Sequence, residues 1–359
     1  RGPRDPLILA GGVAVTLNPE PLADFMDLFF LGEAEEALPE LTARLLAARE
    51  EGLGRDECLY GLQREVEGVY VPRWYYPSYR PDGPLESFAP RDPTLPVQVR
   101  RRWVARLDIP VEQAVDTPDA ALGDMFLTEV SRGCPRGCRF CAAGYVYLPA
   151  RFRDWPSVEA SLRRGLERAG RIGLVGTAVS DHPDLLRMCR YILERQGRIA
   201  VGSLRLDRLN REAIGLLKAG GVETLAIAPE AGSQRLRDMM GKGIDQGDID
   251  ATASALLEEG MENLRVYVMI GLPGETEEDV EALVEMVAGL ARHSVSAGGR
   301  DRRFRRITVS VNQFIPKPVT PFQWEPLERP ETVKRRLGRI RAAFRARGPV
   351  RIQAESLRG

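Results

Sequence analysis

The chain has 359 residues, of which 43% are hydrophobic and 28% charged, and its 51 basic residues balance 51 acidic ones. It is long enough to bury a large core, and its length and its five cysteines exclude the class of small secreted domains held together by disulfides. No apolar run approaches the roughly 18 residues of a membrane span and no signal peptide is visible, so we expect a cytoplasmic protein, of two domains by length.

Residues 1–67 are expected to form an incomplete Rossmann-like α/β segment. The pattern predicts a strand at 6–10, a helix at 20–26, a strand at 28–31 and a helix at 36–49. This order is typical of a parallel layer, but two strands with their helices make an incomplete sheet. The segment therefore either docks on the next domain or lacks earlier strands. Because the chain does not begin with methionine, we expect a preceding N-terminal segment.

Residues 68–125 form a connector rich in proline and aromatic residues. Aromatics such as Trp74 and Tyr79 are interleaved with four prolines between Pro72 and Pro84. Because proline fixes φ and removes a backbone donor, we expect an extended strap. Its aromatics either line a ligand cleft or attach the strap to both domains, and the second role is the more common one for such contacts.

Residues 126–324 show a regular alternation of strands and helices. Strands are expected at 126–131, 171–175, 199–204, 223–228, 264–270 and 307–312, and helices at 157–169, 183–196, 211–220, 248–259 and 276–290. Thr276, with Asp279 three residues later, predicts a capped start for the last of these helices. The alternation predicts an α/β fold, a partial (β/α)6 TIM-like barrel with function at the carboxyl ends of its strands.

Three cysteines stand close together in the loop after the first of these strands. Cys134, Cys138 and Cys141 form a C-x3-C-x2-C triplet. Three thiolates on a short loop can hold three corners of a cubane iron–sulfur cluster, which leaves the fourth iron without a protein ligand. A structural zinc site is the alternative, but it needs a fourth ligand, and the nearest histidine, His182, lies 41 residues beyond Cys141. The spacing therefore favours an iron–sulfur cluster with an open coordination site.

The triplet, with Phe140 directly before its last cysteine, resembles the signature of the radical S-adenosylmethionine (SAM) superfamily. The resemblance implies a [4Fe-4S] cluster whose open iron binds the amino and carboxylate groups of SAM, with Phe140 in the cofactor pocket. It also implies that an electron from the cluster breaks a carbon–sulfur bond of SAM to give a 5′-deoxyadenosyl radical. The electron would come from a donor such as a flavodoxin or ferredoxin, and the residues do not identify the substrate.

The resemblance also implies contacts to SAM after the second and third strands. The candidates for the SAM amino group are Gly176, Thr177, Ser180 and Asp181, in a run that also fits an ordinary helix start. After the third strand, Ser203, Arg205 and Asp207 share one face by strand periodicity. A serine, a cation and a carboxylate on one face suit the carboxylate and ribose of SAM, and a surface ion pair is the alternative.

The ends of the fourth and fifth strands supply further candidates. Glu230, followed by Gly232, stands where a carboxylate can accept hydrogen bonds from ribose hydroxyls. Ile270 and Gly271 resemble the superfamily's adenine-contacting segment, in which backbone groups and the isoleucine would meet the purine. One match at each strand end, in chain order, is far more specific than any single match.

The sequence outside these motifs resembles that of the uncharacterised radical SAM proteins with a cobalamin-binding domain. The matching segments begin at Leu9, Phe30, Cys141 and Ala228. However, the D-x-H-x-x-G run that would supply a histidine to cobalt is absent, and Ala34 replaces a glycine that is common in that family. These departures argue against cobalamin binding by this chain. A cobalamin-assisted methylation and a radical modification without cobalamin both stay open.

Residues 325–359 form a basic region that we expect to be helical. Residues 292–351 carry 16 basic and 4 acidic residues, whereas residues 1–71 carry 6 basic and 14 acidic ones. Arginines between Arg335 and Arg347 alternate with apolar residues, which favours a solvated helix face over a nucleic-acid site. The alternative to the enzyme is a non-catalytic iron–sulfur or zinc module that binds RNA through this basic region.

Overall fold

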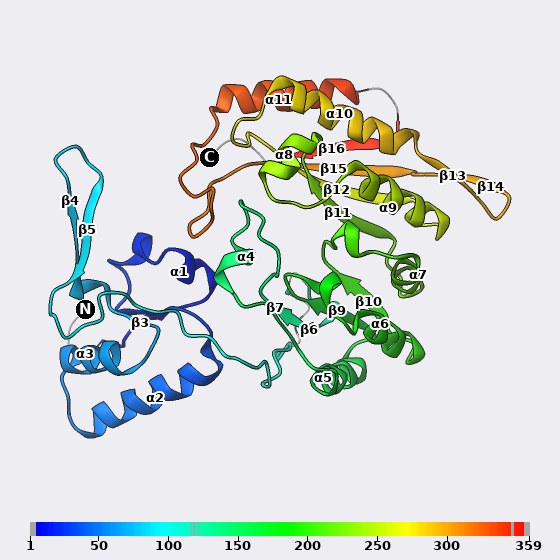
Figure 1. The fold of residues 1–359 in the computed structure, drawn as a ribbon. Helices are drawn as coiled ribbons and strands as arrows, with labels where there is room; N and C mark the ends of the chain where they lie inside the picture. Colours follow the sequence, from blue (N-terminus) through cyan, green and yellow to red (C-terminus); the bar gives the residue numbers. More distant parts are fainter. Residues whose placement is uncertain (1–4, 116, 118, 121, 346–347, 355–359) are drawn as a thin grey trace. The chain divides into compact units, whose positions relative to one another are not determined.

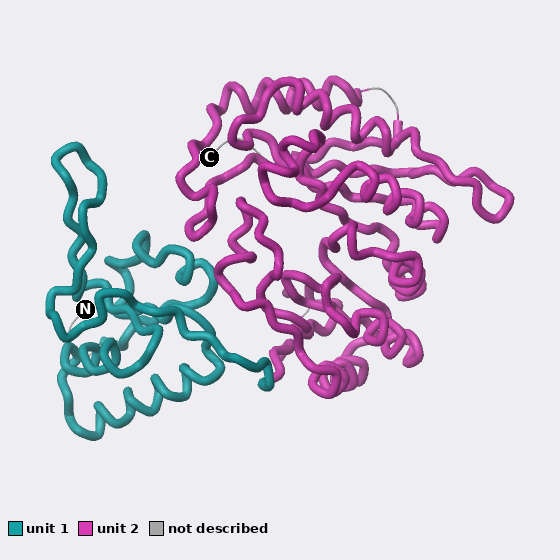
Figure 2. Tube along the Cα trace, viewed as in Figure 1, with its two compact units in different colours: residues 1–109 teal, residues 110–359 magenta. Residues whose placement is uncertain are grey.

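The computed structural model describes residues 5–115, 117, 119–120, 122–345 and 348–354. The chain divides into two compact units, residues 1–109 and 110–359 (Figure 2). The finer division that we expected, with boundaries after residues 67, 125 and 324, stays a prediction. In the part of the chain that the structure describes, no helix combines the length and apolar character needed to cross a membrane.

Unit 1 is built on a three-stranded sheet. Its elements are β1 (Leu9–Ala10), α1 (Val13–Leu17), β2 (Leu28–Phe30), α2 (Ala34–Glu50), α3 (Arg55–Glu65) and β3 (Val69–Tyr70). The order is β1-β2-β3, with β1 parallel and β3 antiparallel to β2. Leu59 and Leu62 of α3 are buried against Leu28 and Phe30 of β2. The expected βα alternation is therefore present, but the third strand turns the sheet from parallel to mixed.

The prediction of one helix in unit 1 was wrong. Instead of a helix at 20–26, the structure has a single 3-10 turn at Glu20–Leu22, and α1 precedes it. Pro19 and Pro21 lie at the cap and in the first turn, where a missing backbone donor is tolerated. The chain leaves the helix because Asp27 bonds to the segment before β1, through its N–H to the Ile8 carbonyl at 3.0 Å and its carboxylate to the Ile8 N–H at 2.8 Å.

The connector contains a β-hairpin, so the prediction of an extended strap was wrong for the central part of the connector. After a 3-10 turn at Pro72–Trp74, β4 (Tyr75–Tyr79) pairs with β5 (Leu85–Pro90), and the hairpin projects from unit 1 (Figure 1). Pro77 lies opposite Phe88. Proline is tolerated because both strands of a lone hairpin are edge strands, where a backbone donor can be missing.

Unit 2 contains two parallel sheets. The strands are β6 (Phe126–Glu129), β9 (Arg171–Val175), β10 (Arg198–Val201), β11 (Thr224–Glu230), β12 (Asn263–Ile270), β15 (Arg306–Gln313) and β16 (Val350–Ala354). The orders are β10-β9-β6 and β11-β12-β15-β16, and every neighbouring pair is parallel. A backbone hydrogen bond from Leu204 to Ala226 links the segment after β10 to β11. The six expected barrel strands are confirmed, and β16 adds a seventh.

Helices alternate with these strands and cover them. They are α4 (Ala143–Val146), α5 (Trp155–Arg168), α6 (Leu185–Glu194), α7 (Arg211–Ala219), α8 (Gln234–Met239), α9 (Gln246–Glu258), α10 (Glu277–Arg292) and α11 (Pro330–Ala343). A polar hairpin, β13 (Ser294–Ala297) with β14 (Arg300–Arg303), precedes β15. The capped start of α10 is confirmed, because Thr276 and Asp279 form a capping box. Alternate residues of β12, among them Leu264 and Val266, face the buried core.

The basic C-terminal region belongs to unit 2. Helix α11 lies beside α10 (Figure 1), and β16 extends the sheet next to β15. Two of its arginines pair with carboxylates of α10: Arg335 with Glu277 at 2.9 Å and Arg339 with Glu281 at 2.5 Å. The apolar side of α11 is buried, as expected for a helix with one solvated face, whereas Arg347 lies outside the described residues.

Candidate cofactor site at the strand ends

A short antiparallel pair of strands closes the base of the cysteine loop. β7 (Ser131–Arg132) pairs with β8 (Arg151–Phe152), and the three cysteines and helix α4 lie between them in the chain. At Gly133, φ is +78° and a Cβ would lie 2.3 Å from the carbonyl oxygen of Tyr147. Glycine is therefore required for the loop to fold back on itself at this point.

The three cysteines are free thiols in a partly buried, cationic setting. Cys138 is buried, whereas Cys134 and Cys141 are half-buried. Burial raises the pKa of the Cys134 and Cys138 thiols. The positive charges of Lys242 and Arg205 act in the opposite direction on Cys138. Because the thiolate is the form that binds metal, these cations suit a metal–thiolate centre.

The number of thiolates on the loop fits a cubane with one open iron, whereas a structural zinc ion needs four ligands. Within the described ranges, no three His, Cys, Asp or Glu side chains are grouped closely enough to hold one metal ion. A cubane places each thiolate on a different iron, so its cysteines lie further apart than the ligands of one zinc ion. A Cβ at Gly137 would meet no other atom within 4 Å, so the loop is open between its first two cysteines.

The end of β9 lies against the cysteine loop. The Thr177 hydroxyl donates a hydrogen bond to the carbonyl oxygen of Gly133 at 2.5 Å. Gly176 lies so close to Ser131 that a Cβ would be 2.2 Å from its Oγ. Thr177 and Gly176, two of the predicted residues, therefore hold the cysteine loop against the end of β9. This structural role does not depend on any contact with a cofactor.

Ion pairs connect the loop with the ends of β9 and β10. Arg136, between the first two cysteines, donates to Asp181, whose side chain is only 7% exposed. Arg208 lies 3.3 Å from the same carboxylate, and Arg136 lies 4.0 Å from Asp207. Burial lowers the pKa of Arg136, but the hydrogen bond and charge of Asp181 outweigh this effect and hold its pKa above the usual value. The arrangement places two guanidinium groups on one buried carboxylate near the cysteines.

Arg205 is held in one orientation by Asp207. Its Nε and Nη2 donate to the two carboxylate oxygens at 2.8 and 3.1 Å, and Nη2 also reaches the carbonyl oxygen of Lys242 at 3.1 Å. Its backbone N–H donates to Ser180 Oγ at 3.1 Å. Thus the structure brings Ser180, Asp181 and Arg205 together. Ser203 is exposed and lies outside this network of described contacts.

Three buried polar atoms in this region lack a hydrogen-bond partner among the described residues. They are Ser131 Oγ, Arg136 Nε and Asp181 Oδ2. Buried polar atoms are paired in the large majority of cases, so a cluster of three unsatisfied ones indicates a site where a polar ligand binds. All three lie next to the cysteine loop or to its ion-pair partners.

The end of β11 holds a strained carboxylate beside a lysine. Glu230 has φ +69°, which is uncommon for a residue other than glycine, and the strand is irregular between Ile227 and Glu230. Lys242 donates to Glu230 at 3.1 Å, and its ammonium lies 5.8 Å from the ring centre of Phe140. Burial raises the pKa of Glu230, and the charge of Lys242 partly opposes this shift. The predicted residues Glu230 and Phe140 therefore meet through Lys242.

Gly232 has a packing role that the sequence did not reveal. A Cβ at this position would lie 2.1 Å from the backbone nitrogen of Leu283 in α10. Its carbonyl oxygen accepts from the buried Arg237 at 2.8 Å. This close approach of backbones accounts for the glycine, and its predicted contact with a cofactor stays a prediction.

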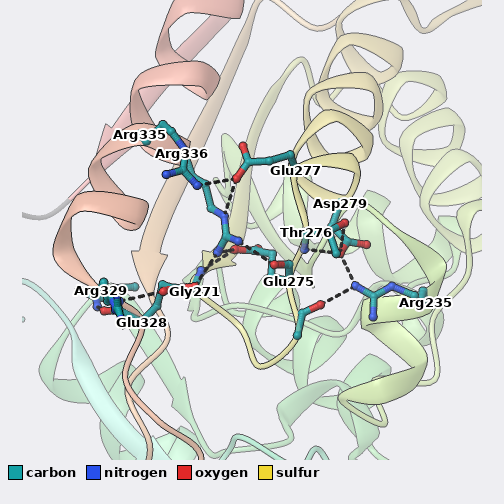
Figure 3. Close-up of polar contacts among 12 residues, drawn as sticks. Arg235, Gly271, Glu275, Thr276, Glu277, Asp279, Glu328, Arg329, Arg335 and Arg336 are labelled. Carbon is teal, nitrogen blue, oxygen red and sulfur yellow. Dashed lines mark hydrogen bonds and ion pairs between the residues drawn. The ribbon is translucent and has the colours of Figure 1, made fainter.

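The end of β12 is a tight turn fixed by a buried charge cluster (Figure 3). Ile270 is 2% exposed and packs in the barrel core. Gly271 follows with φ +76°, and its N–H donates to Glu275 Oε2 at 2.7 Å. Arg336 of α11 binds Glu275 in turn. The two predicted residues thus lie on a turn that distant side chains hold in place.

Sequence reasoning missed Arg136, Lys242 and Arg336. Lys242 carried one usable signal, since the chain has only four lysines among its 51 basic residues. Arg136 and Arg336 carried none, because their partners lie 45 and 61 residues away in the chain. Only folding reveals such pairs.

Two parallel sheets with a three-cysteine loop and polar groups at their strand ends place the chain in the class of α/β barrel proteins. Residues 128–287 match the radical SAM superfamily, and residues 1–72 match the N-terminal region of radical SAM proteins. An uncharacterised protein of Methanocaldococcus jannaschii is 30% identical over 354 residues, which cover 98% of this chain and 68% of that relative. The chain therefore belongs to the radical SAM superfamily and has its partial TIM-barrel fold, and this membership implies a [4Fe-4S] cluster and SAM.

Two further comparisons cover smaller shares of the proteins matched. An uncharacterised methyltransferase of Pyrococcus horikoshii is 30% identical over 168 residues, 45% of this chain and 36% of that protein. The radical SAM methyltransferase TsrM of Kitasatospora setae, solved with cobalamin and a [4Fe-4S] cluster, matches with a TM-score of 0.57 at 17% identity. That match covers 88% of this chain and 58% of TsrM, and at this identity it shows the fold alone.

Proposed function

We propose that this radical SAM enzyme cleaves SAM reductively at the strand ends of unit 2 and so generates a 5′-deoxyadenosyl radical. One combined observation carries the proposal. The loop with three free thiols lies next to three buried polar atoms that lack a hydrogen-bond partner among the described residues and to an arginine held in one orientation. When bound, the cluster supplies the electron that breaks a carbon–sulfur bond of SAM. The protein binds and orients SAM and excludes water from the radical.

Residues around the loop have distinct proposed tasks. Cys134, Cys138 and Cys141 hold the cluster. Because Asp207 occupies Nε and Nη2 of Arg205, the Nη1 side of the guanidinium is left for the carboxylate of SAM.

The remaining predicted residues are assigned by the chemistry of their groups. The predicted residues after β9 contribute polar atoms for the SAM ammonium. The main one is the Asp181 carboxylate, whose Oδ2 lacks a hydrogen-bond partner among the described residues. Glu230 accepts from the ribose hydroxyls. The backbone of Ile270 and Gly271 lies against the adenine, since the Ile270 side chain is buried in the core, and Phe140 lies nearer the cluster.

Anaerobic reconstitution with iron and sulfide tests the proposal. We expect a brown protein with the absorption and electron paramagnetic resonance of a four-iron cluster, which after reduction converts SAM to 5′-deoxyadenosine. Cys138→Ala should abolish both, because two thiolates are too few to hold the cubane. Cys58→Ala, at a half-buried cysteine of unit 1, is the matched control and should change neither. A colourless protein with stoichiometric zinc and no SAM cleavage would falsify the proposal.

We also propose cobalamin-assisted methyl transfer as a second candidate. It is favoured by the match to TsrM, which extends over 88% of this chain. However, unit 1 contains no histidine, since the two histidines are His182 and His293. His182 is buried and its ring contacts the Arg153 carbonyl at 3.1 Å and the Asp184 N–H at 3.0 Å. The chain's residues therefore do not fit histidine ligation of cobalt in unit 1.

Binding of hydroxocobalamin separates the two candidates. The purified chain is mixed with hydroxocobalamin, passed over a desalting column and examined by its visible spectrum. Retention of about one equivalent of cobalamin supports the methyl-transfer candidate. In that case we expect a visible spectrum without histidine ligation of cobalt. Loss of all cobalamin on the column, with SAM cleavage retained, leaves a radical modification without cobalamin.

A further inference from the structure

The turn at the end of β12 is attached to the C-terminal helix by buried charges. Arg336 of α11 is 6% exposed at its side chain, and its partner Glu275 is 3% exposed. Glu277 and Glu328 also contact the same guanidinium, at 3.4 and 3.2 Å (Figure 3). One buried arginine is thus shared by three carboxylates, from the end of the turn, the start of α10 and the segment that precedes α11.

The hydrogen bonds of Arg336 fix both the side chain and the backbone of Glu275. Nη1 donates to Oε2 at 2.8 Å, and Nη2 donates to the carbonyl oxygen at 2.6 Å. The same Oε2 accepts the N–H of Gly271 at 2.7 Å. The guanidinium therefore orients the carboxylate that closes the turn from Gly271 to Glu275.

The cluster continues to the end of the neighbouring strand. Asp279, which caps α10, accepts from Ser233 Oγ at 2.6 Å and pairs with Arg235. Arg235 also donates to the carbonyl oxygen of Gly274 at 2.8 Å. Ser233 follows Glu230 by three residues, so the turns after β11 and β12 are joined through one set of side chains.

The burial of Arg336 is hard to explain by helix packing alone. Val333, Leu337 and Ile340 already bury the apolar side of α11. A buried ion pair repays its desolvation only when its geometry is well satisfied, and apolar side chains of similar volume often replace one without loss of stability. Arg339 and Glu281 join the same two helices while 45% and 49% exposed. Burial of Arg336 is therefore tied to the turn that it contacts.

We propose that Arg336 is a positioning residue, which holds the turn from Gly271 to Glu275 in the shape that receives the adenine of SAM. This inference rests on the proposed function, in which Ile270 and Gly271 meet the adenine. Arg336 touches neither SAM nor the cluster and acts through Glu275. The C-terminal helix thereby contributes to SAM binding from outside the barrel.

Arg336→Gln is compared with Arg339→Gln, which makes the same change on the same helix at an exposed ion pair. SAM affinity is measured by equilibrium dialysis with reconstituted protein, and hydrogen exchange of the 271–276 amides is measured without SAM. We expect Arg336→Gln to weaken SAM binding about 10-fold and to speed exchange at Gly271, because a charge-assisted hydrogen bond is lost. Iron content should stay unchanged, and Arg339→Gln should match the wild type. Arg336→Lys keeps the charge and should lie between Arg336→Gln and wild type.

Each outcome decides the proposal. If Arg336→Gln binds SAM and exchanges as the wild type does, or if Arg339→Gln has the same effect, the positioning role is refuted. Should Arg336→Gln fail to fold, Arg336→Lys carries the comparison, and wild-type affinity in that variant refutes the role. If the wild type binds no SAM, the proposed function fails, whereas faster exchange in the variant alone would still support the effect of Arg336 on the turn.

Discussion

Replacing Gly232 by alanine should destabilise unit 2 strongly. A Cβ there would lie 2.1 Å from the nitrogen of Leu283, 2.2 Å from its Cα and 2.5 Å from the carbonyl carbon of Ala282. All three are backbone atoms that no side-chain rotation can move, so α10 or the end of β11 must shift by about 1 Å to restore ordinary contact. Overpacking of this kind costs about 3 kcal/mol, at the upper end of its usual range.

Thermal unfolding measures this cost. For a unit of this size, about 3 kcal/mol corresponds to a fall in melting temperature of about 6 to 12 °C. Gly289→Ala is the matched control, because Gly289 lies within α10 and a Cβ there would meet no atom within 4 Å. It should stabilise the protein by about 0.5–1 kcal/mol, since alanine is the better helix former. A Gly232→Ala variant that melts with the wild type but loses SAM binding would refute the packing argument and favour direct cofactor contact.

Three further predictions concern charges at the strand ends. Burial raises the pKa of Glu275 to about 7 from 4.5, so the native state retains a proton that the unfolded state releases between these values. Stability in urea should therefore fall as pH rises through this window, and Glu275→Gln should remove the slope; an unchanged slope contradicts this. Lys242→Met should cost about 3 kcal/mol in urea denaturation by leaving Glu230 buried without its partner, and adding Glu230→Gln should restore most of the loss; no recovery would count against the pairing. Asp207→Asn should release Arg205 and weaken SAM binding about 10-fold in equilibrium dialysis at unchanged iron content, and wild-type affinity would contradict its orienting role.

The barrel was predictable because its strands and helices have strong periodic patterns. Residues 263–270 alternate between buried and half-buried side chains, as a strand of this sheet requires. The capping box of Thr276 and Asp279 likewise depends on residues three apart in the chain. Local patterns of this kind fix an element without knowledge of its partners.

The hairpin β4–β5 and strand β16 were missed for physical reasons. Pro77, Pro84 and Pro90 weaken the strand pattern of residues 75–90, although an isolated hairpin tolerates them. β16 is five residues long and follows a strongly basic stretch, so its pattern alone gives little information. Its place is decided by the free edge of β15, which only the folded sheet provides.

The sequence suggested candidate residues for the site but not the contacts that hold them in place. The cysteine spacing predicts cluster ligands. Arg205 and Asp207 were grouped as residues of one strand, but the structure ends β10 at Val201 and pairs them at 2.8 Å around a 3-10 turn at Leu206–Arg208. By contrast, the strained backbone of Glu230 and the contact of Lys242 with it depend on burial and on a turn between them. Contacts that orient a ligand-binding side chain leave no local pattern.

Attachment of the β12 turn to α11 bears on the order in which the protein is made. Residues 330–354 leave the ribosome after every strand end that carries a candidate SAM contact, yet they supply Arg336 and the strand that covers the edge of β15. The base of the cysteine loop pairs within residues 131–177. Inside the loop, however, Arg139 bonds to the backbone of Met239, Met240 and Phe322. The cysteine loop and the β12 turn are therefore both completed late in synthesis, by residues that follow the strand ends to which they belong.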